Sequence, residues 1–235
     1  MKQTIRTWLA GMVSVVVCFS LASCGATPTE QNAAFYQKSD FQPLSTVNGK
    51  PTFFDQSYVD AYVEFQDRYL ELTKQRIEAD YQNQLLTQEQ YDEKMAAYQT
   101  ARSENTRNAV IESLVKDTLL EQEASRRGVS LSVQECIQDA KAYTDNLKQT
   151  LSSGDGTDKD ESIALFEAFL DDLGMTYDEY AESYLAYSFY IREAEQEVTK
   201  ALANEKGLAN ESEDVKAEAF SSYMDELYEQ AEVTG

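Results

Sequence analysis

The sequence has no histidine, and it holds only three cysteines, three prolines and one tryptophan among its 235 residues. Without histidine, the chain has no imidazole for general acid–base catalysis, for a nucleophilic triad or for the commonest kind of metal site. It also lacks paired cysteines at zinc-binding spacing, a glycine-rich phosphate loop and a G-x-S-x-G nucleophile elbow. The sequence therefore predicts no catalytic residue, no metal site and no cofactor, and we do not expect an enzyme.

Acidic residues outnumber basic residues by 42 to 20, which gives the chain a net charge of −22. A surface of this sign repels a phosphate backbone, so we expect no nucleic-acid partner. It attracts basic partners instead. The abundance of carboxylates also explains pairs such as Asp171 with Asp172, while Glu193 and Glu197 suit a solvated helix face. A hydrolase with two acidic residues is therefore the less favoured interpretation of these pairs.

Proline and glycine are scarce after Pro51, and this scarcity predicts a mainly helical chain. Apolar residues keep helical spacing from residue 58 to residue 85, which predicts a helix that ends near residue 86. Thr87 with Gln90 forms a capping box, which predicts the start of a second helix. The two helices form either a hairpin or a longer arm that continues toward residue 107.

Residues 107–135 predict two core helices joined by a tight turn. Apolar side chains cover more than half of the first helix at about 100° per residue, as expected for a helix buried on two sides. They are Val110, Ile111, Leu114, Val115, Leu119, Leu120 and Ala124. Arg126 places positive charge at the end of this helix, and Gly128 supplies the left-handed residue that terminates it. Ser132 with Glu135 then forms the capping box of the next helix.

A stripe of tyrosines marks the helix that we expect after Thr176, which forms a third capping box with Glu179. The large side chains of this stripe share one narrow helix face. They are Tyr177, Tyr180, Tyr184, Tyr187 and Ile191. Packing in the core is the favoured interpretation, above all for Tyr180 and Tyr187, and a surface for client polypeptides is the alternative. Residues 211–232 predict a C-terminal helix that docks on the same body.

The segment at residues 152–162 is rich in serine, glycine and aspartate, and this composition predicts a loop. Its acidic cluster suggests a calcium site. The segment nevertheless lacks the central glycine and the final glutamate that an EF-hand loop starting at Asp155 would need. A solvated loop is therefore the favoured interpretation.

Three motifs together resemble the N-terminal chaperone domain shared by SurA, the PrsA foldases and, more distantly, trigger factor. They are the helix, Gly-Val turn and capped helix of residues 107–135, the V-N-G of residues 47–49, and the F…L…G-hydrophobic-T-x-x-x-aromatic pattern of residues 166–180. The resemblance covers residues 45–200. It implies an all-α, irregular helical fold with a long helical arm or hairpin, a C-terminal docking helix and at most one short strand near residues 47–52.

The same resemblance implies a protein that binds polypeptides without a nucleotide or a covalent step. A parvulin prolyl-isomerase domain usually follows in SurA and PrsA. Only 37 of the 235 residues follow Val198, whereas a further domain takes about 100. We therefore expect no isomerase activity.

The first 24 residues resemble a bacterial lipoprotein signal. Lys2 and Arg6 precede an apolar run at residues 8–22, which is about 15 residues long and too short to span a bilayer as a helix. The run ends in Leu-Ala-Ser-Cys, which resembles the lipobox and implies that Cys24 becomes a lipidated N-terminal residue. An ordinary signal peptide with a coincidental cysteine is the alternative.

These motifs divide the chain into three parts. They are a signal peptide at residues 1–23, a flexible tether at residues 24–44, and a helical domain at residues 45–235. Within the domain we expect the strand and arm at 45–106, the core helices at 107–200 and the C-terminal helix at 201–235. Because Cys18 leaves with the signal and Cys24 is lipidated, Cys136 is the remaining thiol, and we expect a buried apolar cysteine rather than a reactive one.

We therefore expect a lipid-anchored protein on the extracytoplasmic side of the cell membrane that binds unfolded or newly exported polypeptides. The sequence is also compatible with a homodimer. The expected client surface lies between the arm and the body, and it is lined by Tyr58, Tyr62, Phe65, Tyr69 and Tyr184. The alternative is a scaffold lipoprotein that binds one dedicated envelope protein.

Overall fold

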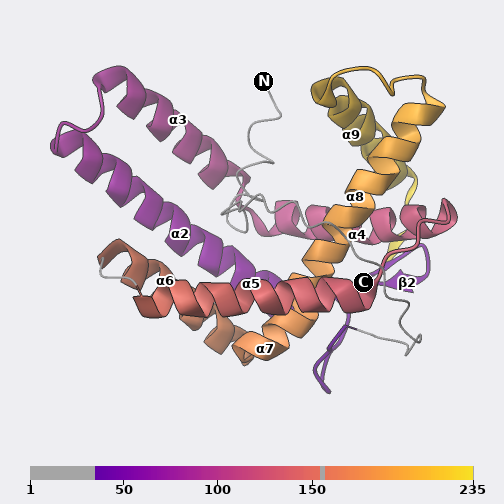
Figure 1. Ribbon diagram of the computed structural model, residues 1–235, viewed down its shortest axis with the longest axis horizontal. Helices are drawn as coiled ribbons and strands as arrows, with labels where there is room; N and C mark the ends of the chain where they lie inside the picture. The colour runs from indigo at the N-terminus through magenta and orange to yellow at the C-terminus, as the bar shows by residue number, and fades with distance from the viewer. Residues whose placement is uncertain (1–34, 154–156, 235) are drawn as a thin grey trace.

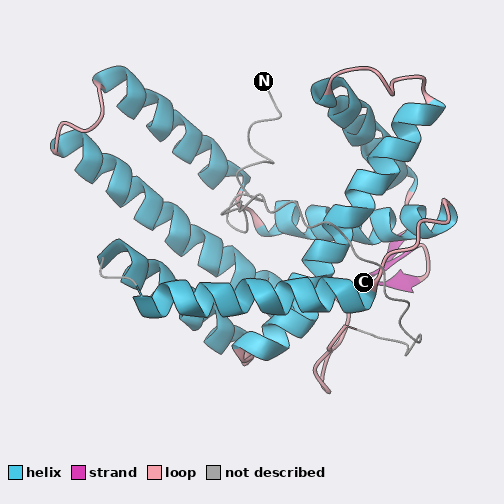
Figure 2. Ribbon diagram, in the orientation of Figure 1, coloured by secondary structure: helices cyan, strands magenta, loops and turns pink. Residues whose placement is uncertain are grey.

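The computed structural model of the protein describes residues 35–153 and 157–234, and these residues are mainly helical (Figure 1). The helices are α2 (Gln56–Gln82), α3 (Gln88–Glu104), α4 (Arg107–Arg126), α5 (Val133–Ser153), α6 (Thr157–Leu173), α7 (Tyr177–Tyr180), α8 (Ala186–Glu205) and α9 (Glu213–Gln230). A π-helical turn, η1 (Ala181–Leu185), joins α7 to α8 within the single helix that we expected. The all-α class predicted from the sequence is confirmed, as Figure 2 shows.

The arm is a helical hairpin made of α2 and α3, which decides between the two arrangements that the sequence left open (Figure 1). The carboxylate of Asp55 caps α2 by accepting a hydrogen bond from the backbone N–H of Tyr58 at 2.8 Å. Thr87 and Gln90 form the predicted capping box at the start of α3. Because α3 packs against α2 and has no buried residue, the distal half of the hairpin projects away from the body.

The body is built around α4, which packs against α2, α8 and α9. The predicted apolar positions Leu114, Val115, Leu119 and Leu120 are all buried. Burial of one such side chain contributes about 1.5–3 kcal/mol, so this helix anchors the core. A second, smaller core lies where α5 packs on α8 and η1, and it includes the buried Cys136. The C-terminal helix α9 docks on α4 and α8, as expected.

Four helices end in the same left-handed turn, in which two backbone N–H groups satisfy the last carbonyls of the helix. The left-handed residues are Gln84 (φ 61°), Gly128 (φ 71°), Gly174 (φ 59°) and Gly207 (φ 71°). Glycine adopts this conformation without steric cost, whereas glutamine does not. After the three glycines, the side chains of Val129, Met175 and Leu208 are buried or half-buried, but Leu85 after Gln84 is 70% exposed. The tip of the arm therefore displays an apolar side chain.

The strand content differs from the single short strand that we expected. Strands β1 (Thr46–Val47) and β2 (Lys50–Pro51) form a hairpin through the V-N-G turn, and β3 (Val233–Thr234) pairs with the other edge of β1. All pairs are antiparallel. The sheet fastens the C-terminal end of the chain to the start of the domain.

Residues 35–44 were assigned to a flexible tether, but they lie against the helical body. The backbone N–H of Tyr36 donates to the carbonyl of Glu182 at 3.0 Å, and the N–H of Leu44 donates to the carbonyl of Phe54 at 2.8 Å. The ring of Phe35 contacts the rings of Phe53 and Tyr187. The rings of Phe35 and Tyr36 supply enough apolar surface to dock this stretch. The polar composition of the segment as a whole gave no sign of this docking.

The loop predicted at residues 152–162 is shorter than expected, because α5 continues to Ser153 and α6 begins at Thr157. The signal peptide at residues 1–23 and the lipidated Cys24 lie outside the described residues. Within the described part of the chain, no helix combines the length and the apolar character needed to cross a membrane.

Candidate functional site

The side chains predicted to bind clients lie at the root of the arm, where α2 meets the body. Tyr58 is 6% exposed and Tyr184 is 4% exposed, and their ring centroids are 4.3 Å apart. Tyr62 stacks on Tyr58 at 5.6 Å, and Phe65 packs against Phe169 at 4.9 Å. The structure thus brings together four of the five predicted residues. Tyr69, one turn further along α2, is half-buried.

Burial controls the chemistry of these tyrosines. It raises the pKa of Tyr62 to about 12, with a further contribution from the charge of Asp117. It also raises the pKa of Tyr58 and of Tyr184 above the ordinary value for a phenol. All three side chains are therefore neutral at physiological pH, as expected for rings in a protein core.

This burial corrects the predicted client surface. Tyr58 and Tyr184 belong to the core in this structure, so neither ring is accessible to a bound polypeptide. The core interpretation of the tyrosine stripe is confirmed for Tyr187, which is 2% exposed, and Tyr180 packs half-buried against the same core. Phe65, Tyr62 and Tyr69 keep part of their surface exposed. The physical reason is that Tyr58 on α2 is covered by Phe169 of α6 and by Tyr184 of η1.

A more accessible hollow lies one to three turns further along the same helix. It is an open groove of about 440 Å³ between α2 and α6. Its lining residues are Arg68, Glu71, Leu72, Gln75, Glu161, Ala164, Leu165 and Ala168. The two leucines and two alanines are the apolar part of the lining, which we call the floor, and we call the four polar side chains the rim. This volume lies within the range of about 300–1,000 Å³ that is usual for ligand-sized pockets.

The carboxylates on the rim of this groove are only partly neutralised by nearby cations. Arg68 is engaged by Glu64 in an i,i+4 ion pair on α2. The ammonium group of Lys74 lies 3.7 Å from the carboxylate of Glu71 and 3.9 Å from that of Glu78, so it is shared between the two. Among the described residues, Glu161 has no ion pair within 4 Å. The groove therefore presents an apolar floor beneath incompletely neutralised carboxylates.

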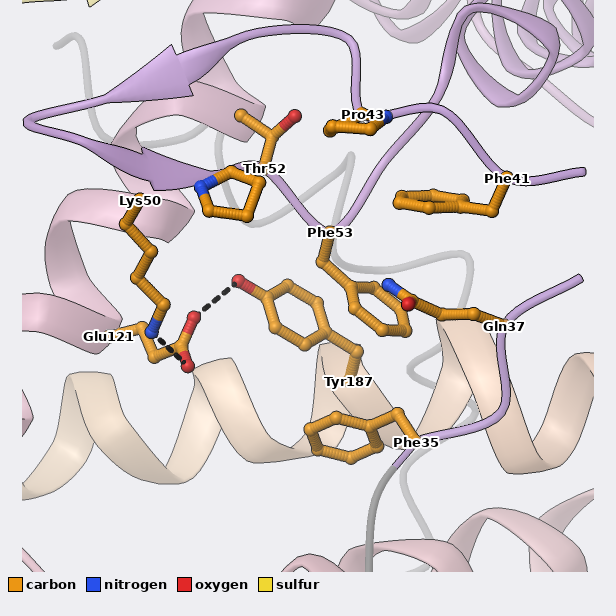
Figure 3. A pocket seen from close by; sticks show the side chains of 10 residues that line it. Phe35, Gln37, Phe41, Pro43, Lys50, Thr52, Phe53, Glu121 and Tyr187 are labelled. Atoms are coloured by element: carbon orange, nitrogen blue, oxygen red, sulfur yellow. Dashed lines mark hydrogen bonds and ion pairs between the residues drawn. The ribbon is translucent and has the colours of Figure 1, made fainter. Parts of the chain in front are cut away.

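A second hollow of about 270 Å³ lies under residues 35–44 (Figure 3). Phe53 stacks on Tyr187 with ring centroids 4.4 Å apart. Figure 3 shows Phe35 below these two rings. Two of the polar side chains that line this hollow are engaged, since Glu121 accepts a hydrogen bond from the Tyr187 hydroxyl at 3.3 Å and pairs with Lys50 at 2.5 Å. The contacts of the Phe35 ring with Tyr187 and Tyr190 fasten the docked N-terminal stretch to α8.

The reactive side chains of the described region do not converge. No cluster of three or more potential metal ligands occurs among the described residues. Cys136 is fully buried, as predicted, and burial together with the nearby carboxylate of Glu193 raises the pKa of its thiol to about 12. The thiol is therefore protonated at neutral pH and is not a nucleophile.

Sequence reasoning missed the groove because its lining residues are ordinary helix formers. One signal was present, since Ala164 and Ala168 are spaced by four residues around Leu165 and place small side chains on one face of α6. Small side chains leave space where two helices approach each other. Nothing in the sequence indicated that α6 would face α2.

The chain matches no protein-family model, and no curated protein or solved structure is detectably similar to it.

Proposed function

We propose that this protein is a non-enzymatic, chaperone-like lipoprotein that binds extended segments of unfolded or newly exported polypeptides in the groove between α2 and α6. The observation that supports this function best is the open, apolar-floored groove formed by Leu72, Ala164, Leu165 and Ala168 at the base of a projecting arm. An open groove accepts a continuous chain, whereas an enclosed pocket accepts only a free small molecule.

The shape of the molecule is consistent with this function. The hairpin of α2 and α3 extends beyond the groove, so a bound chain can follow α2 away from the body (Figure 1). The proposal includes the lipid on Cys24, which would hold the protein at the extracytoplasmic face of the membrane, where exported chains emerge unfolded. Catalysis is not part of the proposal, because the sequence has no histidine and the buried thiol of Cys136 is protonated.

Filling the groove tests this function. Ala164 is exposed on α6, so Ala164→Trp places a large ring over the apolar floor at little cost to the fold. The purified wild-type protein should suppress the aggregation of several unrelated denatured proteins, measured by light scattering, and Ala164→Trp should lose most of this effect. Ala217→Trp changes a residue on α9 that is also exposed and remote from the groove, and it is the matched control.

Two outcomes would count against the proposal. If Ala164→Trp protects the denatured proteins as well as the wild type does, the groove is not the binding site. If the wild type protects none of them, the chaperone function itself is wrong. The second result would favour a scaffold that binds one folded partner, a function to which the exposed Leu85 at the tip of the arm is suited.

A further inference from the structure

We infer that the groove between α2 and α6 selects polypeptide segments in which an apolar side chain is flanked by lysine or arginine. This inference rests on the proposed function and adds the class of segment that is bound. It depends on three observations, namely the apolar floor, the unbalanced carboxylates of the rim and the continuation of both helix faces beyond the groove.

The apolar floor selects the central side chain of the bound segment. Leu72 of α2 and Leu165 of α6 line the groove from opposite helices, and the small side chains of Ala164 and Ala168 leave the space between the helices open. A volume of about 440 Å³ accommodates a large aliphatic or aromatic side chain. Burial of that side chain supplies the non-specific part of the binding energy.

The rim selects the charge of the neighbouring residues. Glu71 and Glu161 line the groove on opposite helices, so a basic residue on either side of the apolar side chain meets a carboxylate. Two nearby cations do not cancel this field, because Arg68 is engaged by Glu64 and Lys74 is shared between Glu71 and Glu78. Arg76 lies outside the lining and donates to Ser162 at 3.0 Å, so that around the groove four carboxylates (Glu64, Glu71, Glu78 and Glu161) stand against three cations (Arg68, Lys74 and Arg76). The groove is therefore complementary to cations and repels acidic segments.

The same charge pattern continues beyond the groove at the end nearer the body. At about 100° per residue, Asp172 falls on the face of α6 that carries Ala164 and Leu165, and Glu64 falls on the face of α2 that carries Arg68 and Leu72. Both carboxylates belong to exposed residues. A longer basic segment therefore meets Asp172 as it leaves the groove, whereas Glu64 is already paired with Arg68.

The overall charge excludes a second copy of the chain as the preferred occupant. Each copy carries a net charge of −22, so two acidic surfaces would have to approach each other around the groove. A basic polypeptide is attracted by the same field, which also accelerates its association at low salt. The acidic surface and the apolar floor thus point to one class of occupant.

Three synthetic peptides test this selectivity against the full-length protein. They share one apolar core of leucine and phenylalanine and differ only in their flanks, which are lysine, serine or glutamate. We expect the lysine-flanked peptide to bind about tenfold more tightly than the glutamate-flanked peptide at low salt in fluorescence anisotropy, since several weak exposed charge pairs contribute together. The difference should shrink at about 0.5 M salt, where screening is strong.

Charge reversal in the groove is the decisive variant. Glu71→Lys with Glu161→Lys should abolish or invert the preference for lysine flanks. Glu218→Lys with Glu229→Lys reverses two exposed carboxylates on α9 and changes the net charge by the same amount, so it is the matched control and should keep the preference. The thermal midpoint of each variant should stay close to that of the wild type, because all four side chains lie at the surface or on the groove rim.

The outcomes separate this inference from the function on which it rests. Equal, saturable binding of all three peptides would overturn the charge selectivity and leave the proposed function in place. An equal loss of preference in both double variants would assign the selectivity to net charge rather than to the groove, and it would also overturn the inference. Absence of binding by all three peptides would reject the proposed function itself.

Discussion

Replacing Glu123 by glutamine tests how the body of the molecule is held together. The buried carboxylate of Glu123 lies near the end of α4 and accepts hydrogen bonds from Nε and Nη2 of Arg126 at 2.6 Å each and from Nε of Arg127 at 2.5 Å. The Tyr223 hydroxyl of α9 donates to the same carboxylate at 2.6 Å. Arg127 also pairs with Glu205 at the end of α8, at 2.6 Å. This network links three helices.

The expected loss of stability in Glu123→Gln follows from the pKa of the Glu123 carboxylate. Burial opposes ionisation of Glu123, but hydrogen bonds from Arg126, Tyr223 and Arg127 outweigh it and lower its pKa to about 2 from the ordinary value of 4.5. One pKa unit corresponds to about 1.36 kcal/mol, so the folded state gains about 3 kcal/mol from the ionised form. Arg126 is 64% exposed, and water screens its share. We therefore expect Glu123→Gln to lower the free energy of unfolding by about 2 kcal/mol.

Urea unfolding followed by circular dichroism between pH 7 and pH 3 measures this effect. Because the pKa of Glu123 is lower in the folded state, its stabilising contribution is complete above about pH 5. The contribution is lost as the pH falls from about 4.5 toward 2. The difference in stability between the wild type and Glu123→Gln should therefore be constant from pH 7 to pH 5 and should shrink at lower pH.

Two results would refute this reasoning. One is a difference below about 0.5 kcal/mol at pH 7, which is the range expected for an exposed pair. The other is a difference of the same size at pH 3 as at pH 7. Glu197→Gln removes the exposed ion pair with Lys200 at 3.7 Å and serves as the control, since it should change stability little at any pH.

Three other substitutions test the turn, the core and the anchor. Gln84→Gly should raise the free energy of unfolding in urea by about 1 kcal/mol, because glycine relieves the steric cost of a φ of 61°, and no gain would mean that the turn is unstrained. Tyr184→Ala should cost roughly 3–5 kcal/mol in the same assay, and a cost below about 1 kcal/mol would place the ring outside the core. Cys24→Ser should abolish incorporation of labelled fatty acid, and a wild-type mature N-terminus at another residue would contradict lipidation.

The helix ends were predictable from the sequence because their signals are local. Thr87 and Thr176 cap their helices through residues three positions away, and Gly128 terminates α4 through the residues next to it. Local composition was a poorer guide at residues 152–162. Serine and aspartate have only a weak preference against helices, and the flanking helices extend into this segment from both sides.

Contacts between distant segments were not predictable in the same way. Strand β3 pairs with β1 across nearly the whole chain, and two residues of strand leave no pattern in the sequence. The aromatic residues at 58–69 show an amphipathic pattern that fits either a core or a binding surface. The choice depends on which helices cover that face, and a single sequence does not contain this information. The capped ends fix where helices begin, but not what they pack against.

The burial of apolar side chains along α2 decides where a client can bind. Tyr58 at the root is 6% exposed, Phe65 and Leu72 are half-buried, and Leu85 just beyond the end of the helix is 70% exposed. Truncating Tyr58 at the root therefore removes core contacts and must lower the free energy of unfolding, whichever function the protein has. Changes beside Leu72 disturb few core contacts and must appear in binding if the groove is used. The same helix thus provides both the fixed base of the arm and the accessible face beside Leu72, and the burial of a residue on α2 predicts which of the two measurements its substitution will change.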